Sequence, residues 1–526
     1  MNENIVVKNR LLDYQALFIL LFAVIIGGLV RFFPIVLSNF PLNDGGLFFR
    51  MAQDILDHSF HLPVYVFYNG NEIPFGYPPF AFYLMAFLQR FFHFGIIDQL
   101  HYLPALISTL TIPVFFYLSE RITGSRVLSV FAVFAYALIP NSFIWLVMGG
   151  GITRSLGILF GILSLFFAWG MFTKYDYKDL ILTILFSSLT VLSHPEVAWF
   201  IFITTLLIVL RSGLNNKGIL FAALCVIGIL LITSPWWLLI IRRFSPALFI
   251  NAFRAEGSLD LSLLIFNFSG EPFSTILAVV ALIGIFAEIY HRRFFLFSWF
   301  IIIALFSPRS GQWLATIPTA MLFGAGLIWV FLPSLSRNIT IVQSNSIHLS
   351  DLFVERISKI ALVFLLIYAL IGALIIPFWA GTKLYSIANY DRQAMEWISN
   401  NTPADSQYVI LTGGEWPTDY VSEWFPALSG RVSVSTVQGS EWLPDEQFRK
   451  NVAAYEALQA CALVDYACIS AWEQENTIPY SYLYVRKSLI DNQGGVNPLA
   501  NASAPPDQFQ LVYENEEVRV YKEINR

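Results

Sequence analysis

Residues 15–37, QALFILLFAVIIGGLVRFFPIVL, form an apolar stretch with Arg31 as its one charged residue, and SNFPLNDGG follows at 38–46. About 20 consecutive apolar residues are enough to cross the hydrocarbon layer of a membrane as a helix. Lys8 and Arg10 precede the stretch and no small-residue cleavage site follows it, so we expect an anchor and not a cleaved signal peptide. The chain is therefore predicted to begin with a spanning helix that opens into a glycine-containing loop.

The composition of the whole chain supports a membrane protein. Its 526 residues are 56% hydrophobic and 13% charged, with a mean hydropathy of +0.63. Soluble domains carry about 25% charged residues. The net charge of −5 and the pI near 5.8 leave no basic surface for nucleic acid, so no nucleic-acid partner is expected.

Further apolar runs of spanning length follow the first one. They predict an α-helical polytopic membrane protein with about eleven transmembrane helices and a small C-terminal α/β domain. The predicted spans are residues 15–37, 100–119, 125–146, 152–172, 180–193, 197–210, 218–241, 272–290, 294–307, 312–331 and 360–379.

The aromatic segment 77–94 decides the orientation of the chain in the membrane. It is short, and Gln89 and Arg90 interrupt it. If it lies in the interface without crossing, the Lys and Arg residues of the short loops fall on one side, as the positive-inside bias requires. We therefore predict a juxtamembrane helix here, a cytoplasmic N-terminus and an extracytoplasmic C-terminal domain.

Two domains follow from this topology. Residues 1–380 are the transmembrane domain, with a long outer loop at 38–99, and residues 381–526 are the outer domain, in which helix and strand signals alternate. There we expect helices at 391–400 and 445–459, strands at 407–412, 432–437 and 466–470, and a hairpin at 509–522.

Cys461 and Cys468 lie on the oxidising side in this topology. On one continuous helix their Cα atoms would be about 10.5 Å apart, beyond the range of a disulfide. The helix is expected to end before Asp465, so a disulfide is possible but not favoured.

Asp44, in Asn43-Asp44-Gly45-Gly46, is the first candidate for chemistry. An acid at the end of the first span, followed by glycines that let another backbone approach closely, suits a catalytic base presented at the membrane surface. The alternative is an N-cap for the helix expected at 47–56, because Asp commonly begins helices.

Three motifs resemble the GT-C superfamily of membrane glycosyltransferases: Asn43-Asp44-Gly45-Gly46, Tyr77-Pro78-Pro79-Phe80 and Ala137-Leu138-Ile139-Pro140. That superfamily includes protein O-mannosyltransferases, oligosaccharyltransferase catalytic subunits and aminoarabinose transferases. The resemblance covers the N-terminal two-fifths of the chain best, and beyond that it is architectural. It implies sugar transfer from a polyprenyl-phosphate carrier to a glycan, lipid or protein acceptor at the outer face. Asp44 matches the first-loop acid that assists the acceptor nucleophile.

The second outer loop departs from the superfamily pattern. Many members carry an acidic motif there, whereas this chain has Gly149-Gly150-Gly151-Ile152-Thr153-Arg154. A Mg²⁺ or Mn²⁺ site is possible but has few oxygen ligands, so we predict that no cofactor is required. The glycine N–H groups and Arg154 instead suit a phosphate, the alternative being that Arg154 snorkels toward the interface.

Four further residues complete the predicted site for the substrate and its lipid phosphate. Arg309 lies in a short outer turn against the positive-inside bias, which suggests a lipid-phosphate ligand, with snorkelling toward ordinary headgroups as the alternative. His194 and Glu196 join two short helices and are expected in a protein-lined cavity, with pairing of Glu196 to Arg154 as the structural alternative. Tyr77 belongs to the same predicted set.

The C-terminal domain places carboxylates beside indole rings. Glu415-Trp416 and Glu423-Trp424 suit recognition of an acceptor by ring stacking and hydrogen bonding, and Glu441-Trp442 repeats the pattern. The alternative is an aromatic core packed against the membrane domain.

Other function classes remain as alternatives: a polytopic transporter, or a non-catalytic membrane protein with an outer sensor domain. Transporters usually place ionisable groups in mid-membrane and show internal repeats, whereas these helix interiors are nearly free of charge. We therefore predict an inverting, polyprenyl-phosphate-dependent glycosyltransferase with Asp44 as base. Membrane lipids are expected to contact its spanning helices.

Overall fold

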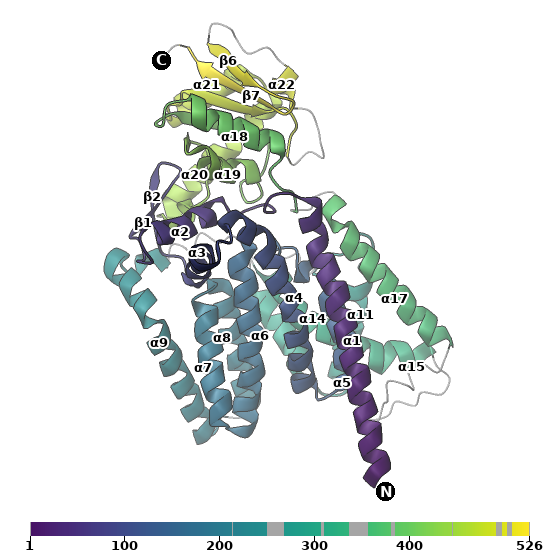
Figure 1. The fold of residues 1–526 in the computed structure, drawn as a ribbon. Coiled ribbons are helices and arrows are strands. Elements are labelled where there is room, and N and C mark those ends of the chain that lie inside the picture. The colour runs from purple at the N-terminus through teal and green to yellow at the C-terminus, as the bar shows by residue number, and fades with distance from the viewer. Residues whose placement is uncertain are drawn as a thin grey trace.

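The computed structural model describes residues 2–212, 214–249, 268–306, 310–335, 356–379, 384–443, 445–490, 497–501 and 508–524. Most of the chain forms a helix bundle, and a small sheet domain made by the C-terminal residues lies at one end of it (Figure 1). Helix α1 begins at the opposite end (Figure 1). The predicted fold class, a polytopic α-helical protein with a small C-terminal α/β domain, is confirmed.

Each predicted span coincides with described helical residues, and seven helical segments of the described chain are long and apolar enough to cross a membrane. The bundle helices are α1 (Asn2–Leu37), α4 (Ile96–Thr123), α5 (Arg126–Leu138), α6 (Gly151–Lys174), α7 (Tyr177–Val191), α8 (Pro195–Ser212), α9 (Asn216–Phe244), α11 (Ile276–Tyr290), α12 (Phe295–Phe306), α13 (Gly311–Leu314), α14 (Thr316–Gly326), α15 (Leu332–Leu335) and α17 (Arg356–Ile375).

The outward faces of the bundle are apolar. Phe18 of α1, Leu231 of α9 and Ile360 of α17 are 73%, 67% and 59% exposed. Apolar surface on this scale marks contact with a membrane. By contrast, most residues of α14 are buried among the other helices.

One predicted span, residues 125–146, is wrong in length because α5 ends at Leu138. Proline disfavours helical conformation in the residue before it, and Ile139, which precedes Pro140, is extended (φ −62°, ψ 119°). A 3₁₀ turn at Pro140–Ser142 follows, so the chain reaches α6 through a loop.

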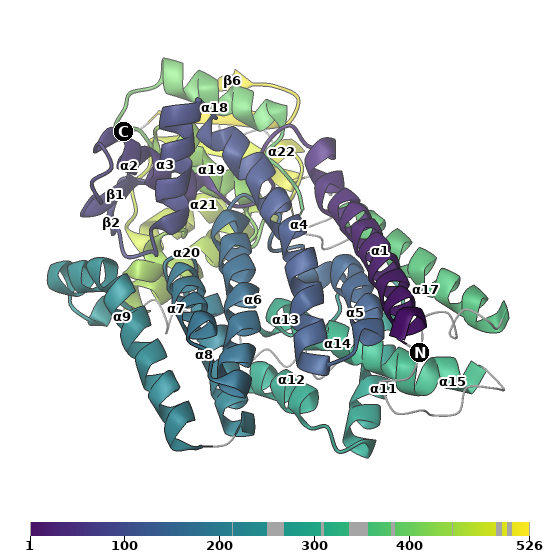
Figure 2. The same ribbon diagram turned by 60° about the horizontal axis from the view of Figure 1, so that its bottom comes forward.

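The first loop is folded, and its elements lie at the end of the bundle that carries the C-terminal domain (Figure 2). They are α2 (Gly46–Asp57), β1 (Tyr65–Tyr68), β2 (Asn71–Pro74) and α3 (Phe80–Phe92). The hairpin turns at Asn69-Gly70, both with positive φ, as two-residue turns prefer. Asn69 Oδ1 accepts a hydrogen bond from Ser433 N at 2.6 Å, which docks the hairpin on the C-terminal domain.

Helix α3 corresponds to the segment predicted to lie in the membrane interface. It has 13 residues and is seen nearly end-on in Figure 1, across the direction of the long helices. At 1.5 Å per residue it is about 20 Å long, which is too short for a hydrocarbon core of about 30 Å.

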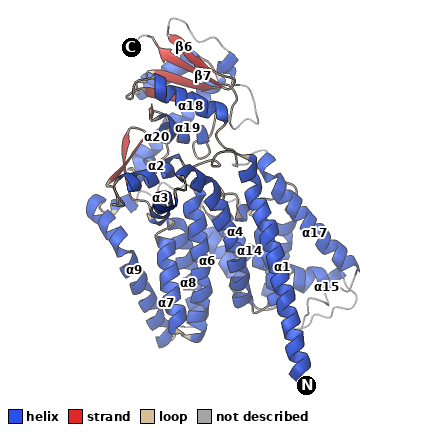
Figure 3. Ribbon diagram, in the orientation of Figure 1, coloured by secondary structure: helices blue, strands red, loops and turns tan. Residues whose placement is uncertain are grey.

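The C-terminal domain contains a five-stranded sheet, whose strands are red at the C-terminal end of Figure 3. Its strand order is β4-β3-β5-β7-β6. β3 pairs in parallel with β4 and β5, and β7 pairs antiparallel with β5 and β6. The elements are α18 (Asn389–Asn401), β3 (Gln407–Leu411), α19 (Tyr420–Ser429), β4 (Val432–Ser433), α20 (Asp445–Ala460), α21 (Tyr466–Asn476), β5 (Tyr482–Arg486), α22 (Pro498–Asn501), β6 (Phe509–Glu514) and β7 (Val518–Glu523).

The strand predicted at 466–470 is wrong, because these residues begin α21. Asp465 caps that helix by accepting a hydrogen bond from Cys468 N at 3.0 Å. The strand beside β3 is instead β5, whose five residues are all buried. A short apolar run does not distinguish a strand from a helix by periodicity alone.

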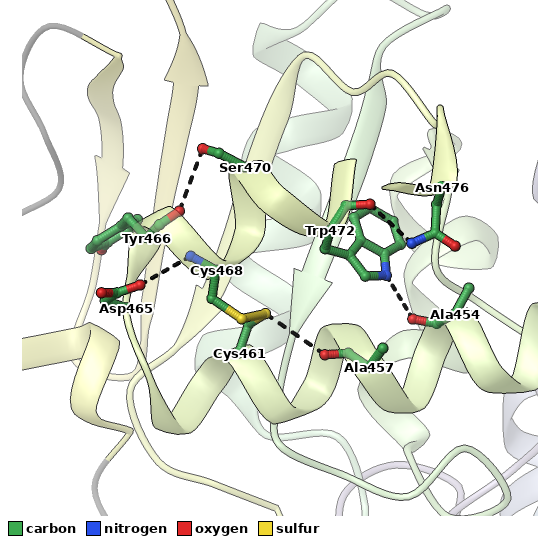
Figure 4. The surroundings of a disulfide bond; sticks show 9 residues. All are labelled: Ala454, Ala457, Cys461, Asp465, Tyr466, Cys468, Ser470, Trp472 and Asn476. Atoms are coloured by element: carbon green, nitrogen blue, oxygen red, sulfur yellow. Dashed lines mark hydrogen bonds between the residues drawn. A yellow bond between two sulfur atoms is a disulfide. The ribbon is translucent and has the colours of Figure 1, made fainter. Parts of the chain in front are cut away.

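Cys461 and Cys468 form a disulfide with a Cα–Cα distance of 5.5 Å, so the expectation against this bond is wrong (Figure 4). α20 ends at Ala460, and residues Cys461–Leu463 form a 3₁₀ turn before α21 begins. The break between the two helices brings the cysteines within bonding range.

Candidate active site

The loop that carries Asp44 is held in place by main-chain hydrogen bonds from two directions. Leu42 forms a β-bridge with Ser386, and Asn43 N donates to Tyr385 O at 2.6 Å. Gly149 N of the second loop donates to Leu42 O at 2.8 Å. The Asp44 backbone is therefore fixed between the second outer loop and the segment that enters the C-terminal domain.

The Asp44 carboxylate points toward the start of α6. Its Oδ1 accepts a hydrogen bond from Gly150 N at 2.9 Å, and its Oδ2 lies 3.0 Å from Arg154 Nη2. Gly150 is the N-cap residue of α6, so the carboxylate also lies at the positive end of a long helix dipole. The Gly150 N–H and Arg154, which we predicted to bind a phosphate, thus bind the Asp44 carboxylate.

The helix-cap alternative for Asp44 is contradicted. The N-cap residue of α2 is Gly45, with φ 139°, and no side chain of the capping residue bonds the helix. Asp44 instead caps α6, which is distant in sequence.

Arg154 is oriented by more than its ion pair with Asp44. Its Nη1 donates to Trp145 O at 3.2 Å, and its guanidinium lies 5.4 Å from the centre of the Trp145 ring. The side chains of Arg154 and Asp44 are 19% and 20% exposed, so the pair is fixed and still accessible.

The glycines of both motifs make this close approach possible. A Cβ on Gly149 would lie 2.2 Å from Asp44 O, and one on Gly150 would lie 2.4 Å from Asp44 Oδ2. On the other side, a Cβ on Gly46 would lie 2.6 Å from Glu423 O. Contacts this short are incompatible with a side chain unless the loop shifts.

A group of aromatic rings is joined to the first turn of α6, which also carries Arg154. Tyr77 Oη lies 3.2 Å from Thr153 Oγ1, next to Arg154 in sequence. The Tyr77 ring lies 6.4 Å from the His194 ring and 5.9 Å from the Trp442 ring, and His194 lies 6.2 Å from Trp313. The structure therefore brings Tyr77 and His194 together, with tryptophans from α13 and from the C-terminal domain.

Glu196 lies in the first turn of α8, close in sequence to His194, and is half-buried. Arg309 lies outside the residues that the structure describes.

The second Glu-Trp pair of the C-terminal domain packs directly on the Asp44 loop. Glu423 Oε1 accepts a hydrogen bond from Gly45 N at 2.9 Å, and Trp424 Nε1 donates to Asn43 O at 2.9 Å. Tyr68 of the hairpin donates its hydroxyl to Glu423 O. The α2 N-terminus, which lacks a local cap, is thus capped by a carboxylate from another domain.

Glu415 and Trp416 have a different position. Trp416 packs on Phe448 with ring centres 5.7 Å apart, inside the C-terminal domain, and Glu415 is exposed. Trp416 O accepts a hydrogen bond from Gln438 Nε2 at 2.7 Å, and Glu415 O accepts one from Thr418 Oγ1 at 3.3 Å, so these contacts also lie within the C-terminal domain.

Burial, followed by the negative charge of Asp44, raises the pKa of Glu423, while N–H donation from Gly45 and Leu47 opposes the rise. The folded state therefore binds the proton of Glu423 more tightly than the unfolded state. Its contribution to stability is complete at pH values below the ordinary glutamate pKa of about 4.3 and is lost as pH rises toward the raised value.

Glu423→Ala is expected to lower the free energy of unfolding by about 1–3 kcal/mol, because it leaves buried N–H groups of α2 without an acceptor. Glu423→Gln keeps an acceptor and cannot ionise, so it should remain stable and lose part of the pH dependence. Thermal unfolding of the purified proteins between pH 5 and 8 checks both. Equal melting temperatures for Glu423→Ala and the wild type would contradict this role.

The residues around Asp44 do not fit a divalent metal ion. Both Asp44 oxygens are engaged, by Gly150 N and by Arg154, and a cation beside Arg154 would be repelled. Within the described residues, no three His, Cys, Asp or Glu side chains are grouped so that they could hold a metal.

Sequence reasoning did not select Trp313 or Tyr385 for this site. Trp313 lies in an apolar run that is typical of a spanning helix, and Tyr385 follows a predicted domain boundary. Neither has a local pattern that distinguishes it from a core or linker residue. Their positions follow only from the packing of distant segments.

Comparisons with protein-family models and with curated protein sequences give no match. Solved structures give matches. ArnT from Cupriavidus metallidurans bound to undecaprenyl phosphate is 17% identical, with 96% of this chain and 98% of that chain covered and a TM-score of 0.55. The archaeal oligosaccharyltransferase AglB from Archaeoglobus fulgidus, in complex with an inhibitory peptide and a dolichol-phosphate, is 14% identical. That match covers 90% of this chain and 69% of AglB, with a TM-score of 0.55.

The arabinofuranosyltransferase AftD from Mycobacteria is 15% identical, with 96% of this chain and 40% of AftD covered and a TM-score of 0.53. At these identities the likeness concerns the fold. The resemblance to GT-C glycosyltransferases is therefore confirmed as a shared fold that extends over nearly the whole chain.

Proposed function

We propose that the protein is an integral membrane glycosyltransferase that transfers a sugar from a polyprenyl-phosphate carrier to an acceptor. One observation carries this proposal: the partly exposed Asp44 carboxylate is held by the α6 N-terminus and Arg154 at one end of a bundle with the GT-C fold. The carrier class is supported by two matched structures, which contain undecaprenyl phosphate and dolichol-phosphate.

The proposed reaction is a single displacement. Asp44 takes the proton of the acceptor hydroxyl or amide as that group attacks the anomeric carbon of the donor. The bond between this carbon and the phosphate oxygen breaks, and the polyprenyl phosphate leaves with the electron pair. One displacement inverts the anomeric centre, whereas retention requires a nucleophilic carboxylate and a second displacement.

Arg154 has a narrower role in this proposal than the sequence suggested. Because it binds Asp44 Oδ2, we assign it to orientation of the base. Stabilisation of the leaving phosphate is assigned to Arg309. Sugar binding is assigned to the aromatic rings of Tyr77, His194 and Trp442, whose faces and edges suit contact with a sugar.

The donor class is tested by incubating purified protein with a panel of polyprenyl-monophosphate sugars and measuring release of free polyprenyl phosphate. Because Arg309 is proposed to take the charge that develops on the leaving phosphate, Arg309→Ala should lower turnover about a hundredfold or more. Activity should persist in a chelator, since the base requires no metal. Wild-type turnover in Arg309→Ala, or complete loss in chelator, would contradict the assignment.

We further propose that the end of the bundle carrying Asp44 faces outside the cell. The Cys461–Cys468 disulfide supports this orientation, because disulfides persist in oxidising compartments. Exposed Asp405 of the C-terminal domain and exposed Lys178 of α7 provide labelling sites.

In intact cells, an impermeant maleimide is expected to label Asp405→Cys but to label Lys178→Cys only after permeabilisation. The wild-type chain is the unlabelled control. Its one free cysteine among the described residues, Cys225, is buried. The reverse pattern would overturn the orientation.

A further inference from the structure

A cavity lies at the end of α2 that is farther from Asp44. Its volume is about 470 Å³, and it is lined by Leu56, Ser59, Phe60, Gln89, Arg90 and His93. Asp44 precedes the first turn of α2, whereas this cavity adjoins its last turn and the last turn of α3. Twelve helical residues span about 18 Å, so the cavity is separate from the proposed active site.

The cavity lining combines one cationic side chain, Arg90, with the polar Ser59, Gln89 and His93 and the apolar Leu56 and Phe60. Arg90 and His93 belong to the lining, and no Asp or Glu does. Arg90 forms no ion pair with another described residue, whereas Arg50, Arg126 and Arg154 each pair with a carboxylate. The lining therefore favours an anion.

Part of the negative charge at the ends of α2 and α3 is satisfied within the chain. Carbonyl groups at a helix C-terminus carry partial negative charge when they lack partners. Here Ile55 O accepts from Phe60 N at 2.9 Å and Leu56 O accepts from Ser59 N at 3.1 Å. At the end of α3, Gln89 O accepts from His93 N at 3.1 Å. These bonds satisfy some of the carbonyl groups at the two helix ends, which reduces their repulsion of an anion.

The face of α3 beside the cavity suits a lipid. Phe87, Phe91 and Phe92 are 45%, 62% and 67% exposed. Figure 1 shows α3 at the level where the bundle helices end below the C-terminal domain. Aromatic side chains prefer this interfacial level, where acyl chains meet headgroups.

We propose that this cavity binds the phosphate headgroup of an anionic membrane phospholipid. Arg90 pairs with the phosphate, Ser59 and His93 lie where they can donate to it, and the acyl chains pack on the exposed phenylalanines of α3. The bound lipid holds α3 in the interface and so supports the first loop.

The test is a titration of the purified full-length protein with phosphatidylglycerol, followed by native mass spectrometry. Arg90→Gln is expected to weaken binding about fivefold, the effect of one arginine near a lipid surface. Arg242→Gln is the matched control, because Arg242 is also exposed, at the end of α9, and does not line the cavity. It should bind like the wild type.

Three outcomes would overturn the proposal. One is unchanged phosphatidylglycerol affinity in Arg90→Gln. Another is an equal loss in Arg242→Gln, which would indicate diffuse surface charge. The third is displacement of the lipid by millimolar inorganic phosphate, which would indicate a site for a free anion. Circular dichroism of both variants distinguishes lost binding from lost fold.

Discussion

Asp44→Asn is expected to reduce sugar transfer about 10²–10⁴-fold, the contribution typical of a general base. The amide keeps the size of the side chain and one acceptor oxygen for Gly150 N, but it cannot take a proton from the acceptor. It also ends the ion pair with Arg154. The measurement is the initial rate of polyprenyl phosphate release by the purified variant.

The fold should survive this change. A partly exposed ion pair contributes about 1 kcal/mol or less, so the melting temperature should shift little. Asp57→Asn is the control: Asp57 is exposed at the other end of α2 and should be dispensable for transfer. Wild-type transfer by Asp44→Asn would refute its role as base, and an unfolded variant would return Asp44 to a structural role.

Most elements of the fold could be predicted from the sequence, because the residues of each element determine its type. Each predicted span is apolar over its own length and coincides with described helical residues, and the α3 segment was distinguished from them by its short length. One error had a local cause: α5 ends at Leu138 because Ile139 precedes Pro140. The other concerns residues 466–470, a short apolar run that periodicity does not assign and that begins α21 after the break joining Cys461 to Cys468.

The residues of the candidate site could be selected from the sequence, but the contacts between them could not. Asp44 and the glycine-rich segment before Arg154 were selected separately, but their contact joins loops that are distant in sequence. Arg154 was assigned to a phosphate because of its positive charge and the glycines before it. The sequence does not reveal that the Asp44 carboxylate occupies the same helix N-terminus. Likewise, the pairing of Glu423 with Gly45 depends on the docking of a separate domain.

Gly150→Ala tests whether the position of the carboxylate, and not only its charge, matters. The backbone at Gly150 (φ −66°, ψ −11°) accepts alanine without strain, so the effect is confined to the added methyl group. That group would lie 2.4 Å from Asp44 Oδ2 and 2.7 Å from its Cγ. The carboxylate must therefore turn away from Gly150 N and Arg154 while keeping its charge.

Displacement of a catalytic group by about 1 Å can cost about 100-fold, so Gly150→Ala should lower transfer at least to that extent without unfolding the bundle. Gly372→Ala is the matched control. Gly372 lies inside α17, and a Cβ there would make an ordinary contact with Pro272 at 3.6 Å. Transfer at the wild-type rate by Gly150→Ala would mean that catalysis does not depend on the Asp44 geometry seen here. A large loss in Gly150→Ala together with normal rates in Gly372→Ala would tie the activity to the contact between the first and second loops.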